Sequence, residues 1–163
     1  MIRDCGRAEV YAAEAAAFDG TDLETIRTFD DVSAAIAAVV GGPWWPGRPV
    51  RVVPARRDAR SSSARDGAGA ASAEIRLAAE QLTIATAAHE LAHVLAGPPA
   101  GHSPVFLAAY LDVVAVITNL DSRDRRHQLH VDQLRRALAA AGLNAGPRTW
   151  PAPPEASNTA IAL

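Results

Sequence analysis

The segment Thr86–Phe106 has the sequence TAAHELAHVLAGPPAGHSPVF, and it predicts both the fold and the chemistry of this chain. His89 and His93 stand four positions apart within it, and Glu90 follows the first histidine. On a helix, two residues at this spacing lie one turn apart on the same face, so both imidazoles can bind one metal ion. Glu90 projects about 100° further round the helix and can contact a water on that metal.

A zinc ion in a catalytic site is held by three protein ligands, and the water at its fourth position has a pKa of about 7. His102 follows His93 by nine residues, just beyond a Pro-Pro turn, and we expect it to be the third ligand. Asp112 or a water molecule is the alternative at this position. We therefore predict one zinc ion, with Glu90 as the catalytic base and with three ligands: His89, His93 and His102.

Apolar residues recur at steps of three and four around the histidine pair, as on the buried face of an amphipathic helix: Ile84, Ala88, Leu91 and Leu95. This helix should begin between Glu80 and Thr83 and end at Ala96 or Gly97, because the two prolines that follow cannot continue it. The alternative interpretation is an ordinary helix that presents two exposed histidines. We favour the metal site, because a helix is the context that the motif requires.

Regular elements are predicted on both sides of the motif. Glu74–Ala78 alternates polar and apolar residues, which is typical of a half-buried strand. After the motif, Ser103 and Pro104 indicate a helix start, and this helix should extend to about Thr118. Its apolar face consists of Phe106, Leu107, Tyr110, Leu111, Val114 and Ile117. We therefore expect His102 in a fixed position between a turn and a packed helix.

The first half of the chain gives weaker signals. Residues 8–13 fit either a strand or the start of a helix, and residues 21–24 have a capping-box pattern before a short segment. A firmer helix is expected from residue 30 or 31 to residue 40, and a strand over residues 50–53. Residues 56–72 lack any apolar period, so we expect a long loop that joins the two strands of a hairpin.

Aromatic and C-terminal segments complete the expected fold. For the loop Pro43-Trp44-Trp45-Pro46-Gly47 we favour a lid on the core over a hydrophobic rim for a substrate. The last helix should run from Asp121 or Ser122 to Ala141, with a solvated basic face and three inward residues: Leu129, Leu134 and Leu138. His127 and His130 are expected at its surface. Residues 144–163 are rich in Pro and Ala and predict a flexible, loosely attached tail.

Composition limits the possible classes of protein. The length of 163 residues suits one domain, which we place at residues 1–143. All 16 basic residues are Arg, which excludes Schiff-base chemistry and a Walker-type lysine. The net charge of −2 gives no general attraction to nucleic acid or an anionic membrane, and no stretch is long enough to span a bilayer. Cys5 is the single cysteine, so no intramolecular disulfide can form, and we expect a cytoplasmic location.

The chain resembles the small actinobacterial HExxH metallohydrolases. The resemblance covers most of residues 3 to about 143, and its specific part is the two histidine blocks. In that family the second block usually has the sequence His-Gly-Pro-Glu-Phe, whereas this chain has Ser103 and Val105 at the second and fourth positions. A more distant resemblance is to SprT-type metalloproteases, whose zinc-ribbon tail and basic DNA-binding surface are absent here. The matching segments are Arg3-Asp4, Val10-Tyr11-Ala12-Ala13-Glu14, Trp44 or Trp45, His89–Leu95, His102–Phe106 and Tyr110-Leu111-Asp112.

The resemblance implies an α+β, zincin-like domain, in which a small twisted sheet packs on the helix that bears the motif and two further C-terminal helices follow. In that fold the strand before the metal helix is a free edge, to which a peptide substrate can add as an extra strand. By position in the sequence this edge strand is Glu74–Ala78. The resemblance implies hydrolysis but specifies no substrate.

These features predict a zinc-dependent metallohydrolase, with a peptidase as the favoured type. Glu90 takes a proton from the zinc-bound water and passes it to the leaving nitrogen of an amide. Tyr110 could stabilise the oxyanion, although its helix position favours core packing, and Asp112 could orient a ligand histidine. The alternative is a non-catalytic, zinc-stabilised domain that binds a protein partner through the edge strand or the Trp loop. Three histidines can also hold other divalent ions.

Overall fold

The computed structural model of the chain describes residues 6–69, 71–120 and 126–155. Within these ranges it contains five α-helices and a three-stranded sheet, which confirms the α+β class. None of these helices is long and apolar enough to cross a membrane. The elements are α1 (Arg7–Phe18), η1 (Asp22–Glu24), α2 (Phe29–Val40), β1 (Val50–Pro54), β2 (Ser63–Asp66), β3 (Ala73–Leu77), η2 (Ala79–Gln81), α3 (Ile84–Ala96), η3 (Pro98–Ala100), α4 (Pro104–Thr118) and α5 (Arg126–Ala140), where η denotes a 3₁₀ turn.

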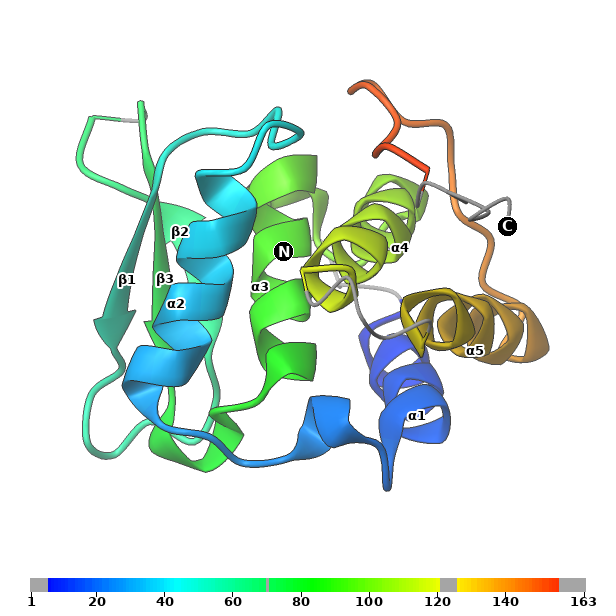
Figure 1. The fold of residues 1–163 in the computed structure, drawn as a ribbon, viewed down its shortest axis with the longest axis horizontal. Coiled ribbons are helices and arrows are strands. Elements are labelled where there is room, and N and C mark those ends of the chain that lie inside the picture. The colour runs from blue at the N-terminus through cyan, green and yellow to red at the C-terminus, as the bar shows by residue number, and fades with distance from the viewer. Residues whose placement is uncertain (1–5, 70, 121–125, 156–163) are drawn as a thin grey trace, which may run out of the picture.

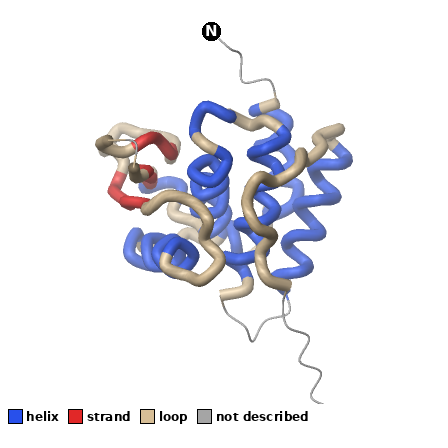
Figure 2. The backbone as a smooth tube through the Cα atoms, turned by 90° about the horizontal axis from the view of Figure 1, so that it is seen from above, coloured by secondary structure: helices blue, strands red, loops and turns tan. Residues whose placement is uncertain are grey.

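Helix α3 lies at the centre of the molecule (Figure 1). The sheet and α2 lie on one side of it, and α4, α5 and α1 lie on the other. Seen from above, the strands again form one flank and the helices fill the rest (Figure 2). Helix α3 packs most extensively on α4. Four of its buried residues are alanines: Ala85, Ala87, Ala88 and Ala92. The central helix is therefore the one that bears the His-Glu-x-x-His motif.

Helix α1 resolves the ambiguity at residues 8–13, because this segment is helical rather than extended. The helix packs mainly on α5. Its buried residues follow the helical period: Val10, Ala13, Glu14, Ala17 and Phe18. One of these residues is a glutamate, although glutamate is rarely buried without a partner. The buried face of α1 therefore brings a carboxylate into the interior.

The sheet differs from the expected hairpin. Its strand order is β1-β3-β2, with β1 parallel to β3 and β2 antiparallel to β3. Val52 pairs with Ile75, and Ile75 pairs on its other side with Ala64. The expectation that residues 56–72 form only a connection was therefore wrong, because they contain β2. The expectation that Glu74–Ala78 is a free edge was also wrong, because β3 is the central strand.

Hydrogen bonds of polar side chains stabilise β2 and the residue before it, and few apolar side chains of this strand are buried. Arg65 donates to Glu74 across the ladder at 2.7 Å, and Ser62 accepts a bond from the backbone N–H of Ala78 at 2.9 Å. The backbone N–H of Ser62 also donates to the Gln81 side chain at 2.6 Å. Hydrophobic pattern analysis cannot detect a strand with a single inward alanine, which explains why the sequence did not predict β2.

The start of α2 is set by a capping box. Thr28 accepts a bond from the backbone N–H of Asp31, and the Asp31 carboxylate accepts one from the backbone of Thr28. Thr21 caps the short turn η1 through the backbone N–H of Leu23 instead of opening a longer helix. The expected second helix is thus confirmed, with its cap two residues earlier than the sequence indicated.

The Trp loop packs against the core, as expected. The Trp45 indole donates to the carbonyl of Arg48 at 2.9 Å, and the Trp44 indole donates to the carbonyl of Pro151 at 3.0 Å. The C-terminal segment is thereby linked to the domain as far as Pro151. Arg148 and the Trp150 indole both donate to the buried carboxylate of Asp112, at 2.8 Å. Residues 156–163 of the expected tail lie outside the described residues.

Helix α5 is rotated relative to the sequence expectation. Leu134 and Leu138 are buried as expected, but Leu129 is 47% exposed and Val131 is buried in its place. His130 is also buried, so its expected surface position was wrong. Its ring packs edge-on against Phe18, and its Nε2 lies 3.4 Å from Asp22. Cys5, residues 121–125 and the Arg3-Asp4 pair lie outside the described residues, and the His127 side chain is not described.

Candidate metal centre

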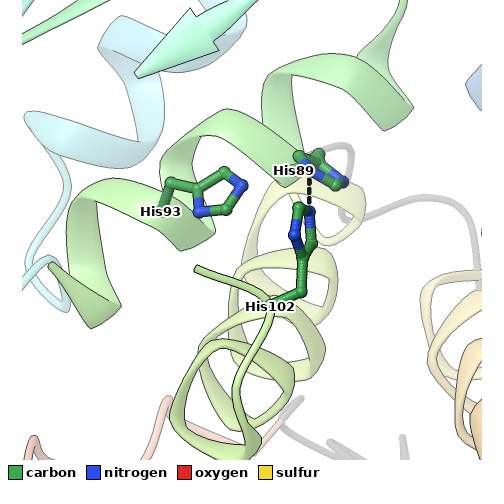
Figure 3. Close-up of side chains that lie close together, drawn as sticks. All are labelled: His89, His93 and His102. Atoms are coloured by element: carbon green, nitrogen blue, oxygen red, sulfur yellow. Dashed lines mark hydrogen bonds between the residues drawn. The ribbon is translucent and has the colours of Figure 1, made fainter. Parts of the chain in front are cut away.

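Three histidines meet beside the central helix (Figure 3). His89 and His93 project from α3, and His102 projects from the turn that precedes α4. Helix α3 begins at Thr83, whose hydroxyl accepts a bond from the backbone N–H of Thr86 at 3.1 Å. The grouping that the spacing predicts is therefore present. It combines one turn of a helix with a residue from the following loop.

Two glycines shape the turn that returns the chain to the site. Gly97 has φ 90° and Gly101 has φ 54°, and both values lie in the region that residues with a side chain rarely adopt. Gly97 ends α3, and Gly101 directly precedes His102. The backbone conformation of these two residues directs His102 back toward the helix that it follows.

The donor atoms of the three histidines lie close enough together to share one metal ion. The candidate ligand atoms of the three histidines all lie within 4.8 Å of one another, and Nε2 of His89 is 3.2 Å from Nε2 of His102. Around a tetrahedral zinc with bonds of about 2.0–2.1 Å, neighbouring nitrogens lie about 3.3–3.4 Å apart. Three imidazoles also form one of the donor sets that zinc prefers. The residues present therefore fit a single metal ion, whose identity the geometry does not specify.

A buried carboxylate on α1 contacts the first candidate ligand, His89. Oε2 of Glu14 lies 2.9 Å from Nδ1 of His89, and both residues are at most 9% exposed. Burial alone would lower the pKa of His89, but the hydrogen bond to Glu14 and the charge of that carboxylate outweigh burial and raise it. A proton on Nδ1 shared with Glu14 leaves Nε2 as the lone-pair atom that faces the other histidines. Glu14 thus selects the tautomer of His89 that can bind a metal.

Aromatic rings enclose the cluster. The buried ring of Phe106 lies 5.1 Å from His89, 4.4 Å from His93 and 4.9 Å from His102, measured between ring centroids. Tyr11 stacks on His89 from the other direction, at 5.3 Å and almost parallel. These contacts limit the rotation of each imidazole, which lowers the entropy lost when a metal binds.

Glu90 lies at the wall of a cavity beside the histidines. Its side chain is 6% exposed, and the cavity has a volume of about 250 Å³. Burial is the main cause that raises the pKa of Glu90 to about 7, and the charge of Glu14 adds to it. The charge of His89 and the backbone N–H of Ala64 on β2 act in the opposite direction. A carboxyl group with a pKa near 7 can exchange protons at neutral pH.

Tyr110 packs in the core, as its helix position favoured, whereas Asp112 has contacts that the sequence did not predict. Tyr110 is fully buried and does not line the cavity, so the exposed tyrosine next to a ligand is Tyr11 instead. Burial, and then the charge of Glu14, raise the pKa of Tyr110 well above its usual range. Asp112 is buried, and its carboxylate accepts hydrogen bonds from Arg148 and Trp150. The suggested contact of Asp112 with a candidate ligand histidine was therefore wrong.

Glu14 is the site residue that sequence reasoning missed as a functional group. No local spacing connects it with His89, which lies 75 positions away. A signal was nevertheless available, because Glu14 follows Val10 and precedes Phe18 by four residues each, on the apolar face of a helix. A carboxylate on a buried helical face needs a partner, and here the partner is an imidazole.

Comparison with protein-family models, curated proteins and solved structures finds no match to this chain. The resemblance of its motifs to known HExxH hydrolases therefore stays a prediction. The description of the fold and of the histidine cluster rests on the structure of this chain alone.

Replacing Glu14 with Gln is expected to weaken zinc binding by about 10- to 100-fold, because the His89 imidazole loses its charged partner. The measurement is the zinc dissociation constant by competition with a coloured chelator. Glu9→Gln is the matched control, since Glu9 lies exposed on the same helix. An unchanged dissociation constant in Glu14→Gln would contradict the role of Glu14.

Proposed function

We propose that this chain is a zinc-dependent hydrolase of peptide bonds, with a zincin-like domain. The observation that supports this most strongly is the placement of Glu90. This glutamate is buried beside three converging histidines and lines the same cavity as His89. A site that only stabilised the fold would have no use for a buried carboxylate on the wall of a cavity.

His89, His93 and His102 are the proposed ligands. Neutral imidazoles suit zinc, although they can also bind other divalent ions. When bound by three protein ligands, zinc supplies Lewis-acid polarisation and a water with a pKa of about 7. The hydrogen bond between Glu14 and His89 keeps that imidazole oriented.

Glu90 transfers the proton in the proposed reaction. Its carboxylate accepts one proton from the attacking water as the C–O bond to the amide carbon forms. The same proton then passes from Glu90 to the nitrogen of the leaving amine as the C–N bond breaks, which regenerates the carboxylate. The low exposure of Glu90 keeps bulk water away from this exchange.

The edge strand next to the site is β2, and it is the proposed binding strand for the peptide backbone. It pairs with β3 on one side only, and it packs on α3. An extended peptide can therefore add to the outer edge of β2 through main-chain hydrogen bonds. This assignment replaces Glu74–Ala78, which occupies the middle of the sheet.

Metal removal and replacement test the proposal. The zinc-loaded protein should cleave members of a broad peptide library, as detected by mass spectrometry of the products. Treatment with a chelator should abolish cleavage, and added zinc should restore it. If zinc-loaded protein cleaves nothing in the library, or if cleavage persists after the zinc is gone, the proposal is wrong.

A further inference from the structure

The cavity beside the metal centre extends well beyond the catalytic residues. It lies between α1, η1 and the N-terminal end of α3, and His89 and Glu90 form part of its lining. Its volume of about 250 Å³ is sufficient for one large side chain. Because His89 and Glu90 both line this cavity, a substrate group that occupies it would lie next to the amide bond that the proposed reaction cleaves.

Most of the titratable side chains that line the cavity are acidic. Among the described residues that line it there are five carboxylates and no arginine: Glu14, Asp19, Glu24, Glu80 and Glu90. Glu14 bonds to His89, and Glu90 is the proposed base. The other three form no ion pair within the described part of the chain. Partial burial, with the charges of Glu14 and Asp19, raises the pKa of Glu24. Arg7 lies over the ring of Tyr11, at 5.5 Å from its centroid, and does not line the cavity. The acidic side chains therefore lie close together with no arginine of the described chain among the lining residues.

The cavity also presents apolar surface to solvent. Four large hydrophobic side chains are exposed in the described residues: Tyr11, Ile26, Leu120 and Leu129. Two of them, Tyr11 (41% exposed) and Ile26 (59% exposed), line this cavity. Exposed apolar side chains beside a cavity are typical of a binding surface. This observation is independent of the acidic residues.

We propose that the cavity selects substrates by a cationic group on an aliphatic stem, as in a peptide with an Arg or Lys side chain next to the scissile bond. The stem would contact Tyr11 and Ile26, and the cation would pair with Glu24 and Asp19. Such amphipathic side chains bury their stem while the charged end remains solvated or paired. A free N-terminal ammonium is a second source of the same charge. The inference rests on the proposed hydrolase function and specifies its substrate.

Binding of fluorescent peptides to the full-length protein tests this inference without requiring cleavage. Four short peptides should be compared by fluorescence anisotropy. Three are capped at both ends and differ at one position, which is Arg, norleucine or Glu, and the fourth is the norleucine peptide with a free N-terminus. Dissociation constants should be measured on zinc-loaded and on chelator-treated protein. The variants are Glu24→Gln combined with Asp19→Asn, and Glu9→Gln as a control outside the cavity.

The Arg peptide is expected to bind about tenfold or more tightly than the norleucine peptide, and the Glu peptide more weakly than both. The double variant should lose most of this preference, the Glu9→Gln control should keep it, and added salt should reduce it. If only the free N-terminus improves binding, the cation is an N-terminal ammonium rather than a side chain. Equal affinities for the charged and neutral peptides, no binding by any peptide, or a preference that the double variant retains would overturn the inference. A charge preference without cleavage would instead refute the hydrolase proposal alone.

Discussion

Replacing Glu90 with Gln is expected to reduce peptide hydrolysis by between about 10²- and 10⁴-fold while zinc stays bound, because Gln cannot accept the proton of the attacking water. The two side chains have nearly the same shape, so the metal ligands should keep their positions. The measurement is kcat/KM together with the zinc content of the same samples. The effect should fall on kcat more than on KM, since the proton moves only during the reaction.

The pH dependence of the unmodified protein gives a second measure of the same group. Burial raises the pKa of Glu90 to about 7, and a dication nearby would lower that pKa. The base must be unprotonated to act, so activity should be lost as the pH falls through its pKa. This acidic limb should disappear from the residual activity of Glu90→Gln.

The control for this experiment is Glu9→Gln, which removes an exposed carboxylate from α1 and should leave kcat/KM unchanged. A Glu90→Gln protein that retains both its zinc and its full activity would refute the role of Glu90. The alternative function, a zinc-stabilised domain that only binds a partner, makes the opposite prediction. In that case Glu90→Gln would leave the affinity for the partner unchanged, because this carboxylate would have no part in binding.

Replacing His102 with Ala is the second change with a large expected effect. It leaves two protein ligands from α3, and three are needed for a stable catalytic zinc site. The loss of zinc affinity should exceed the roughly 10- to 100-fold expected when only a supporting partner such as Glu14 is changed. Competition with a coloured chelator measures both variants on the same scale.

His130→Gln is the matched control, because His130 is another buried histidine, and it lies against Phe18 rather than at the site. This variant should keep the zinc affinity of the unmodified protein. If His102→Ala retained the original affinity as well, the third ligand would be another group or a water molecule.

The part of the molecule that the sequence predicted best is Thr86–Phe106, which contains the three histidines and Glu90. The spacing of His89 and His93 predicts a common face of α3, and the structure places both there together with His102. The start of α4 after Ser103 follows from the Ser-Pro pair, and α3 begins within the expected range, after Thr83. These features depend on residues close in sequence, which is why local rules are sufficient to predict them.

Features that depend on distant pairing were missed. The parallel pairing of β1 with β3 and the edge position of β2 depend on which strands meet, and β2 has almost no apolar pattern. Glu14 contacts His89 only in the folded chain, because the two residues are 75 positions apart in the sequence. The phase of α5 was also misjudged, because Leu129 and His130 are neighbours and the structure buries the histidine. The buried His130 ring packs edge-on against Phe18 of α1, a contact between residues far apart in the sequence.

The most direct test of the central claim is the number of zinc ions bound per chain at equilibrium, measured for the unmodified protein and for His102→Ala side by side. Three histidines that converge on one position predict one zinc per unmodified chain, and at the same free zinc concentration much less than one for the variant. A chain that takes up no zinc, or a variant that binds as much zinc as the unmodified protein, would contradict the three-histidine site.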